Sequence, residues 1–353
     1  MFGLLRTILA INVVAYHILK VPAIGPYAVY SFFILSGFLM TMIMQKTYGY
    51  TLLGFKNYAS NRLLRLYPIY WILMLVTLII IYFVGNDIAQ EFHHSLRVPT
   101  TWQEFLINTL MIFPGLMEYP TRVLPATWAL TIELFFYLLI GLGISRNRKV
   151  TLVWFISSIS YMVFIMYSTK AIAYDYGSLL TASLPFSLGA FIYHYKQSLY
   201  SLLERYIPLK VSLPLFIVNL ALSLSLPIFW SDSFSWKMSF IFETLNIALT
   251  ACLILQLQNI KTNKKWMTLD KKIGDYSYPI YIFHWTAALI VFWLLTVPNI
   301  QISKLNNDIV IFLGALAISY VIGSFANKFN DKYIEKLRKK NRKVKGKRNL
   351  AKV

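Results

Sequence analysis

The first apolar segment of the chain carries two ionisable side chains at a spacing that suits chemistry. In LLRTILAINVVAYHILK, residues 4–20, Arg6 and His17 are eleven residues apart. Eleven residues make about three helical turns, so both side chains leave one helix face, about 16 Å apart along the axis. An imidazole accepts and returns protons near neutral pH, and a guanidinium binds anions. Inside an apolar segment the pair predicts a functional site, with a surface anchor and a polar neighbour as the alternative.

Three later stretches contain further polar candidates: Arg62 and Arg65 in NRLLRLYPIYW, Trp128 and Glu133 in TWALTIELFFYLL, and His284 in GDYSYPIYIFHW. Arg62 and Arg65 are three residues apart and therefore share a helix face. Two close guanidinium groups favour an anion site, with anchoring at a membrane surface as the alternative.

The elements that must position these residues are apolar helices. The chain is 58% hydrophobic, and its apolar residues form long runs instead of alternating with charge. Runs of about 20 apolar residues predict membrane-spanning helices. We therefore predict an all-α integral membrane protein, a bundle of about ten transmembrane helices. The predicted spans are residues 4–20, 27–45, 67–84, 127–144, 150–167, 177–194, 211–228, 239–258, 276–296 and 308–326.

The distribution of basic residues predicts the orientation of the bundle. The formal net charge is +20, and with the N-terminus in the cytoplasm all but six of the 34 Lys and Arg residues lie in or beside cytoplasmic loops. This positive-inside pattern and an even number of spans predict that both termini are cytoplasmic. The first segment has no small-residue cleavage site after it, so we expect a retained helix.

Two units follow from this arrangement. We predict a ten-helix membrane domain over residues 1–327 and a basic cytoplasmic tail over residues 328–353. The tail is rich in Lys and Arg and is expected to contact anionic membrane lipid. It lacks interleaved aromatic residues and a folded module around it, which argues against binding of nucleic acid.

The polar parts of the chain predict neither a second folded domain nor a metal site. Residues 85–126 contain FLINTLMIF, which is too short to span, so we expect an extracytoplasmic loop with an interfacial or re-entrant helix. His93 and His94 are adjacent and would point in different directions on a helix, with no further ligands obvious nearby. Cys252 is the single cysteine, which excludes an internal disulfide.

Four stretches resemble one protein family in their order along the chain. They are YSFFILSGFLMT (30–41) and the three stretches quoted above, and they follow the pair formed by Arg6 and His17. Together they resemble the membrane acyltransferase-3 family over nearly the whole chain. The resemblance implies transfer of acyl groups, often acetyl from acetyl-CoA, to extracytoplasmic sugars and other acceptors. It also implies that Arg6 and His17 are essential, and gives roles to the arginines before the third helix and to the Trp and Glu of the fourth.

On this resemblance, the cytoplasmic side of the bundle binds the acyl donor, acetyl-CoA. Arg6 is expected to hold a CoA phosphate, helped by Arg62 and Arg65, while the acyl arm follows the helix face toward His17. His284 lies about ten residues into the ninth span and is expected to line that path, with a satisfied core histidine as the alternative.

The chemistry is expected near the outer end of the first helix. His17 would take a proton from an acceptor hydroxyl and return it to the leaving thiolate. Glu133 lies about 9 Å below the outer boundary by helical rise, close in depth to His17, where a carboxylate could support the imidazolium. The alternative is a protonated acid that packs helices. Trp128 is expected to stack on the acceptor sugar, or to belong to the aromatic belt, and Ser36 with Gly37 to permit close helix packing.

We therefore expect a multi-pass protein of the cell membrane, the bacterial cytoplasmic membrane in particular. Its expected function is to move an acyl group, acetyl above all, onto a hydroxyl of a cell-surface polysaccharide or of its lipid-linked precursor. The expected partners are acyl-CoA, an extracytoplasmic sugar or polysaccharide, and membrane lipid. The alternative from another class is a non-catalytic transporter of a glycan or lipid intermediate, in which the intramembrane charges line a route.

Overall fold

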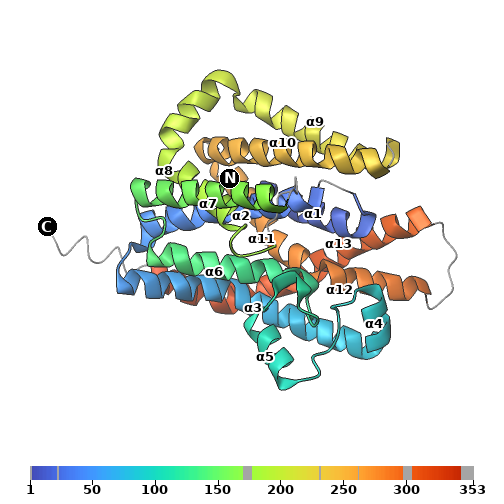
Figure 1. Cartoon of the computed structure of the whole chain (residues 1–353). Coiled ribbons are helices and arrows are strands. Elements are labelled where there is room, and N and C mark those ends of the chain that lie inside the picture. The colour runs from blue at the N-terminus through green and yellow to red at the C-terminus, as the bar shows by residue number, and fades with distance from the viewer. Residues whose placement is uncertain are drawn as a thin grey trace.

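Helices account for every regular element in the part of the chain that the structure describes (Figure 1). The structure is a computed structural model, and it describes residues 2–21, 24–169, 177–229, 232–260, 262–296 and 304–342. Its α-helices are α1 (Gly3–Leu19), α2 (Ile24–Ile43), α3 (Leu52–Val84), α4 (Asn86–Phe92), α5 (Trp102–Leu110), α6 (Trp128–Leu142), α7 (Arg148–Thr169), α8 (Ser183–Tyr206), α9 (Leu209–Phe229), α10 (Asp232–Asn259), α11 (Lys264–Asp275), α12 (Ser277–Thr296), α13 (Lys304–Phe329) and α14 (Glu335–Arg342). Short π or 3-10 turns are η1 (Met44–Tyr48), η2 (Leu116–Glu118), η3 (Pro125–Thr127) and η4 (Asn330–Ile334).

Fewer helices qualify as membrane spans than the ten predicted. Among the described residues, seven helices are long and apolar enough to cross a membrane, or up to eight if α8 and α9 form one broken span. These two helices meet at an angle of 80°. α1 has 17 residues, which make about 26 Å of helix against the roughly 30 Å of a hydrocarbon core. The described helices thus support a helical integral membrane protein with multiple spans, but not the predicted number.

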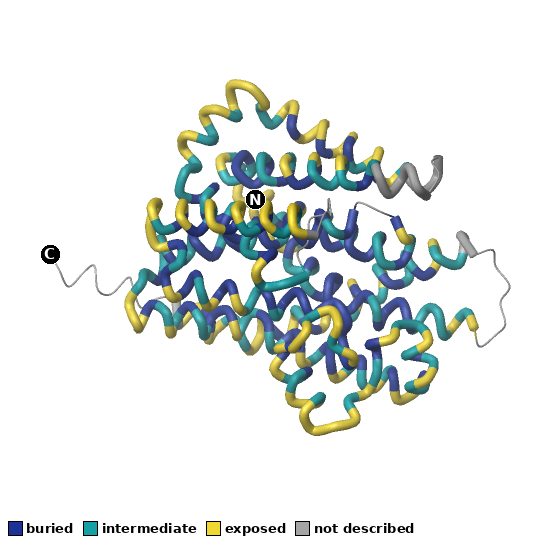
Figure 2. Tube along the Cα trace, in the orientation of Figure 1, coloured by how far each residue is buried: buried dark blue, intermediate teal, exposed yellow. Residues whose placement is uncertain are grey.

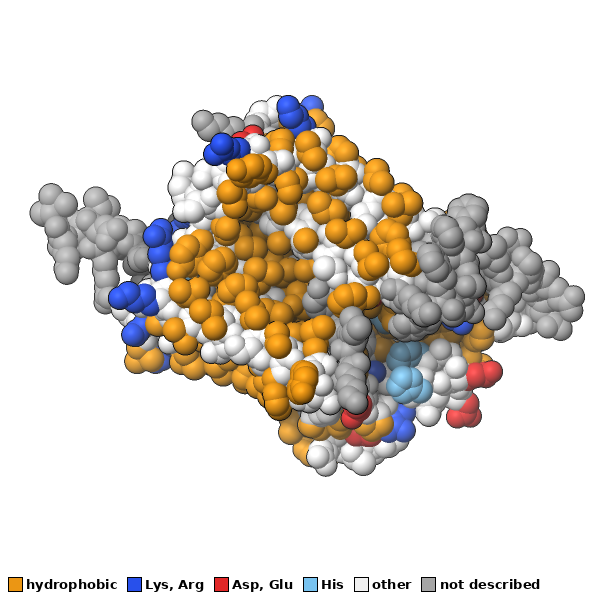
Figure 3. Space-filling model, turned by 45° about the horizontal axis from the view of Figure 1, so that its top comes forward, with side chains coloured by type: hydrophobic (Ala, Val, Ile, Leu, Met, Phe, Trp, Pro, Cys, Tyr) orange, Lys and Arg blue, Asp and Glu red, His pale blue; other side chains and the backbone are white. Residues whose placement is uncertain are grey.

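The outer surface of the helices is apolar over a broad area (Figure 3). Val153, Ile156, Leu313 and Val321 all have exposed side chains on α7 and α13. Lys and Arg side chains gather at the left end of the molecule in this view. A large contiguous apolar surface is unfavourable in water and suits the hydrocarbon of a bilayer, where helices satisfy their own backbone groups.

The two ends of the bundle differ in their elements (Figure 1). The tail end, on the left, holds the start of α3, the end of α6, and α14, whereas the loop end holds α4, on the right, and α5, at the bottom of the view. At the tail end Asn61 on α3 donates from Nδ2 to the carbonyl oxygen of Arg338 on α14 at 2.9 Å. Arg338 Nε donates in return to Asn61 Oδ1 at 3.3 Å. Residues 343–353 of the predicted tail lie outside the described residues.

Helix α2 lies inside the bundle and is buried along most of its length (Figure 2). Its contact with α8 is close because glycines face backbone on both sides. A Cβ atom at Gly37 would lie 2.1 Å from the carbonyl oxygen of Phe186, and one at Gly189 would lie 2.0 Å from that of Ile34. Small residues allow such backbone contact between helices. The predicted packing role of Gly37 is thus confirmed.

The start of α1 is held by α11. The carboxylate of Asp270 accepts hydrogen bonds from the backbone N–H groups of Gly3 and Leu4, each at 3.0 Å. Thr7 Oγ1 donates to the carbonyl oxygen of Ile273, also at 3.0 Å. A carboxylate at a helix N-terminus satisfies free N–H groups and stabilises the positive end of the helix dipole. This cap fixes the position of Arg6, one turn into the helix.

The connection between α3 and α6 folds into a compact loop, as predicted for a short helix that does not span. α5 is bound to α3 by hydrogen bonds from Tyr67 Oη to the Leu110 carbonyl at 2.6 Å and from Trp71 Nε1 to the Thr109 carbonyl at 2.9 Å. Within the loop, Arg97 pairs with Glu104 at 3.0 Å. The loop thus packs against the membrane helices at the loop end of the bundle.

Candidate active site

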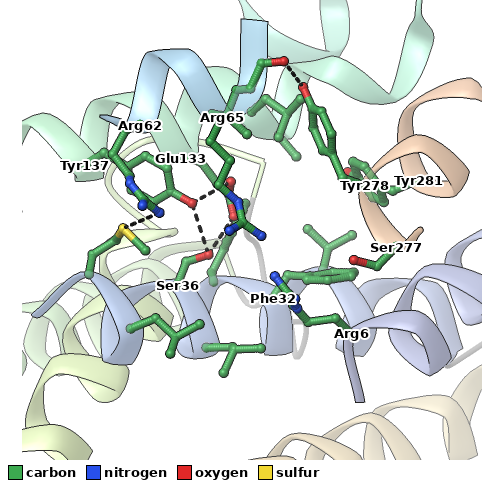
Figure 4. Close-up of a pocket in the computed structure, with 18 residues that line it drawn as sticks. Arg6, Phe32, Ser36, Arg62, Arg65, Glu133, Tyr137, Ser277, Tyr278 and Tyr281 are labelled. Atoms are coloured by element: carbon green, nitrogen blue, oxygen red, sulfur yellow. Dashed lines mark hydrogen bonds between the residues drawn. The ribbon is translucent and has the colours of Figure 1, made fainter. Parts of the chain in front are cut away.

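Helices α1, α2, α3, α6 and α12 surround a cavity that we name the arginine pocket (Figure 4). Arg6 from α1, Arg62 and Arg65 from α3, and Glu133 from α6 line it, in an empty volume of about 840 Å³. α12 adds aromatic side chains, Tyr278 and Tyr281. The three arginines predicted to form an anion site are therefore brought together from two helices that are distant in sequence.

The arginines of this pocket are not neutralised by acidic partners. The ion pairs found among the described residues lie elsewhere, at Arg97–Glu104 and Arg338–Glu335. The Nε atoms of Arg6 and Arg62 are buried without a hydrogen-bond partner, and Arg62 Nη1 meets Met40 Sδ at 3.7 Å. A buried guanidinium N–H without a partner is costly. Three arginines against one glutamate make the pocket suited to an anionic ligand.

Glu133 lies in the arginine pocket and does not support His17. Its Oε1 accepts from Ser36 Oγ at 2.7 Å, and its Oε2 accepts from Tyr137 Oη at 3.0 Å. The structure therefore places Glu133 and His17 in different cavities and does not bring them together as expected from their depths. Helical rise gives the depth of a residue but not the neighbour it faces, and the Glu133 face of α6 turns toward α2 and α3.

The two hydrogen-bond partners of Glu133 were not predicted as site residues. Tyr137 follows Glu133 by four residues, a spacing that places both on one face of α6 and that could have revealed the pair. Ser36 was grouped with Gly37 as a packing residue. Adjacent residues on a helix point about 100° apart, so Gly37 faces α8 while Ser36 faces the arginine pocket.

A second cavity, which we name the histidine cavity, lies at the other end of α1. His17 lines it together with Phe92 and Trp285, and its other polar lining residues are Lys20, Thr296, Asn307 and Asp308. Its empty volume is about 1240 Å³. The ring centroids of His17 and Trp285 are 5.0 Å apart. An imidazole in a cavity with aromatic walls suits a ligand that has both apolar faces and hydroxyl groups.

His284 lies against His17 and does not line the arginine pocket. The two imidazole rings are stacked, with centroids 5.3 Å apart and planes 14° apart. His284 is fully buried, and its Nδ1 lies 2.7 Å from the carbonyl oxygen of Tyr281. A carbonyl oxygen can only accept, so Nδ1 carries the proton and Nε2 the lone pair. Nε2 has no hydrogen-bond partner.

The loop that follows α4 covers this pair of histidines. The ring of His93 contacts Trp285 edge to face, with centroids 4.2 Å apart. Burial, together with the nearby His94, Arg122 and His284, lowers the pKa of His93 to about 3, so this ring is neutral at pH 7. Among the described residues, no group of three His, Cys, Asp or Glu side chains is placed to hold a metal ion.

Trp128, the residue predicted to contact the acceptor, opens α6. It is buried, and it lines neither the arginine pocket nor the histidine cavity. Stacking on an acceptor therefore stays a prediction for Trp128, whereas Trp285 is the tryptophan that lines a cavity beside His17.

One face of α12 connects the two cavities. Ser277, Tyr278 and Tyr281 line the arginine pocket, and Trp285, four residues further, lines the histidine cavity. Residues four apart lie on one helix face. Tyr281 contributes to both regions, because its side chain lines the arginine pocket while its carbonyl oxygen binds His284. Like α1 with Arg6 and His17, its neighbour α12 thus contributes side chains to both cavities.

Comparison with known proteins gives this arrangement a family. A family model described as an acyltransferase domain matches residues 2–326. No match was found among curated proteins or among solved structures. The matched range includes every residue that lines either cavity. The chain therefore belongs to the acyltransferase-3 family of membrane acyltransferases.

Proposed function

We propose that this membrane acyltransferase moves an acetyl group from acetyl-CoA to a hydroxyl of a cell-surface polysaccharide or of its lipid-linked precursor. The observation that carries the proposal is the separation of two cavities along α1 and α12. One cavity has arginines that suit an anionic donor, and the other has a histidine beside aromatic rings that suits a hydroxyl-bearing acceptor. The reaction is then an O-acetyl transfer across the length of the site.

The arginine pocket supports CoA as the donor. CoA carries phosphate groups, and Arg6, Arg62 and Arg65 offer guanidinium N–H groups that are free of acidic partners among the described residues. Planar guanidinium groups bind phosphate through paired hydrogen bonds. Arg6 and His17 are about 16 Å apart along the helix axis, so an extended thioester arm must run between the cavities.

His17 is proposed to be the general base. Its imidazole takes the proton of an acceptor hydroxyl as the hydroxyl oxygen attacks the thioester carbonyl carbon. The new ester bond forms, the carbon–sulfur bond breaks, and His17 returns the proton to the departing thiolate. The stacking partners of the acceptor sugar are proposed to be Trp285 and Phe92, which line the same cavity.

The proposed setting is the bacterial cytoplasmic membrane, with ten spans over residues 1–327 and with both termini in the cytoplasm. The support is the positive-inside pattern of the Lys and Arg residues. With this orientation the arginine pocket faces the cytoplasmic supply of acyl-CoA, and the histidine cavity faces the extracytoplasmic acceptor.

Acetyl transfer in membrane vesicles tests this function. Inside-out vesicles from a producing strain, enclosing its envelope polysaccharide, receive CoA carrying a radiolabelled acetyl group, and the label in the polysaccharide is measured. We expect labelling by the parent protein, none by His17→Ala, and parental labelling by the control His94→Ala, whose side chain is exposed. Labelling by His17→Ala at the parental rate, or none by the parent, contradicts the proposal.

A further inference from the structure

A second imidazole lies against His17, and the proposed function does not use it. His284 is fully buried on α12, stacked on His17, and holds its Nδ1 proton in a 2.7 Å hydrogen bond to the Tyr281 carbonyl. Its Nε2 is buried without a partner. A buried, unpartnered acceptor costs free energy that folding must offset elsewhere. Such an atom next to a base calls for a functional explanation.

The base itself lacks a carboxylate. Glu133 forms its hydrogen bonds with Ser36 and Tyr137 in the other cavity. The imidazolium that His17 becomes on accepting a proton must therefore be stabilised by another group. Asp308 lines the same cavity but forms no ion pair with His17, and His93 contributes a neutral ring from the loop.

We propose that His284 is a positioning residue for His17, an inference that rests on the proposed function. Its tautomer is set by the Tyr281 carbonyl, so its Nε2 lone pair is available to an N–H group of the protonated His17. The rings are stacked with centroids 5.3 Å apart. An imidazole nitrogen lies about 1.1 Å from its ring centre, so edge-on rings at this separation leave about 3 Å between nitrogens, a normal hydrogen-bond distance.

The step is a rotation of the His17 ring about its Cβ–Cγ bond. In the neutral state the ring stacks on His284 and keeps one nitrogen free for the acceptor hydroxyl. The neutral ring already carries one N–H group, and protonation adds a second on the nitrogen that faces the acceptor. When the His17 side chain turns so that the first N–H enters the plane of the His284 ring, that N–H donates to His284 Nε2, while the second N–H keeps its proton until the departing thiolate takes it. A neutral imidazole thereby does for His17 what a carboxylate does in hydrolase triads.

Two substitutions separate this role from packing. The amide of asparagine in His284→Asn can reproduce the donor at Nδ1 and keep the bond to Tyr281, but it leaves no acceptor at the Nε2 position. The longer amide in His284→Gln can place an oxygen acceptor near that position instead. If His284 acts through Nε2, the Gln variant is the more active of the two. If His284 only holds α12 through the Tyr281 carbonyl, the Asn variant is the more active.

Kinetics in the vesicle assay measure this difference. We expect kcat to fall about 10- to 100-fold in His284→Asn, with the KM for acetyl-CoA within about twofold of the parent, and we expect His284→Gln to recover a large part of kcat. The control His94→Phe keeps parental kcat. Equal activity of the Asn variant and the parent overturns the inference, and so does a rise in KM without loss of kcat. A parent that transfers no acetyl group overturns the proposed function instead.

Nitrogen NMR tests the tautomer without activity. The chain has five histidines, so protein labelled with ¹⁵N-histidine gives few signals, and His284→Asn assigns the one that is lost. We expect the His284 signals of the parent to show a protonated Nδ1 and an unprotonated Nε2, in lipid nanodiscs at pH 7. A protonated Nε2 would remove the lone pair on which the inference depends and would overturn it, even if the protein transfers acetyl groups.

Discussion

The arginine pocket and the histidine cavity share two helices, α1 and α12, but differ in their chemistry. α1 supplies Arg6 to one and His17 to the other, and α12 supplies Tyr278 and Trp285 in the same way. In the arginine pocket, three arginines face one glutamate, Glu133. Its carboxylate accepts hydrogen bonds from Ser36 and Tyr137 rather than from an arginine. In the histidine cavity, rings contact rings and few charges are present.

This difference indicates that anion binding and proton transfer take place at separate positions along α1 and α12. An anion site gains from fixed charge, whereas a general base near neutral pH must lose and regain its proton easily. Three arginines beside His17 would disfavour its protonated form by like-charge repulsion. Placing the arginines about three turns away avoids that conflict. Each cavity can therefore be weakened without the other, which the following substitutions test.

The largest effect is expected from Arg6. Arg6→Ala removes one charge-assisted contact to a CoA phosphate, which costs about 1.5 to 3 kcal/mol, or roughly 10- to 150-fold in affinity. Arg6→Lys recovers only part of this loss, because an ammonium group lacks the planar fork. Calorimetry with CoA on protein in nanodiscs measures this affinity. The control His17→Ala should bind CoA with the parental affinity. Parental affinity in Arg6→Ala would contradict the prediction and make Arg6 a surface anchor.

Substitution of Trp285 is expected to have a smaller effect, on the binding of the acceptor instead of the binding of CoA. Trp285→Ala removes an aromatic wall of the histidine cavity, worth about 0.5 to 1.5 kcal/mol, so the acceptor concentration for half-maximal labelling rises about 2- to 12-fold. The affinity for CoA stays at the parental value. Trp128→Ala is the matched control, since Trp128 lines neither cavity. A larger effect of Trp128→Ala would restore the sequence-based assignment of the acceptor site.

Glu133→Gln should change donor affinity in the direction opposite to Arg6→Ala. The substitution removes the one negative charge that lines the arginine pocket, so an anionic donor should bind about two- to threefold more tightly. One of the hydrogen bonds from Ser36 and Tyr137 weakens as well, which lowers the melting temperature slightly. Calorimetry and thermal unfolding measure these effects. A large loss of turnover at unchanged CoA affinity would instead revive a link between Glu133 and His17.

The smallest effect is expected from Glu104, which makes the stability of the loop end depend on acidic pH. Burial alone would raise the pKa of Glu104, but hydrogen bonds from Thr121 and Thr100 and the charge of Arg97 outweigh it and lower that pKa. Ionised Glu104 therefore stabilises the folded loop fully above its unfolded-state pKa of about 4.3. This stabilisation is lost as the pH falls through the lower pKa of the folded state. We expect Glu104→Gln to abolish this acid dependence in hydrogen exchange of α5, at a cost below about 1 kcal/mol. If the protection factors of α5 in the parent, taken relative to the intrinsic exchange rate at each pH, do not change with pH, the prediction is contradicted.

Features that depend only on the geometry of a single helix could be predicted from the sequence. The spacing of Arg6 and His17 places them at opposite ends of a face, and they line different cavities. Arg62 and Arg65, three residues apart, share one cavity as well. These statements need only helical geometry, which is the same in every context. The all-α class follows similarly from long apolar runs.

The parts that depend on contacts between helices could not be predicted. Depth along α6 suggested that Glu133 meets His17, but lateral packing turns Glu133 toward Ser36. The stacking of His17 on His284 depends on the contact between α1 and α12, which no spacing within one segment encodes. Likewise, α8 and α9 overlap two predicted spans but pass as span candidates only as a pair, bent by 80°.

The face of α1 between Arg6 and His17 has a consequence for the energetics of the cell. Leu9, Ala10 and Val13 on this face are buried to at least 99%, and they offer no group that could pass a proton along it. The polar Asn12 lies on another face, where its Nδ2 donates to Tyr27 Oη. In the proposed orientation, an apolar face between the two cavities would keep protons from crossing the membrane with the acyl group, so acyl transfer would not dissipate the proton gradient.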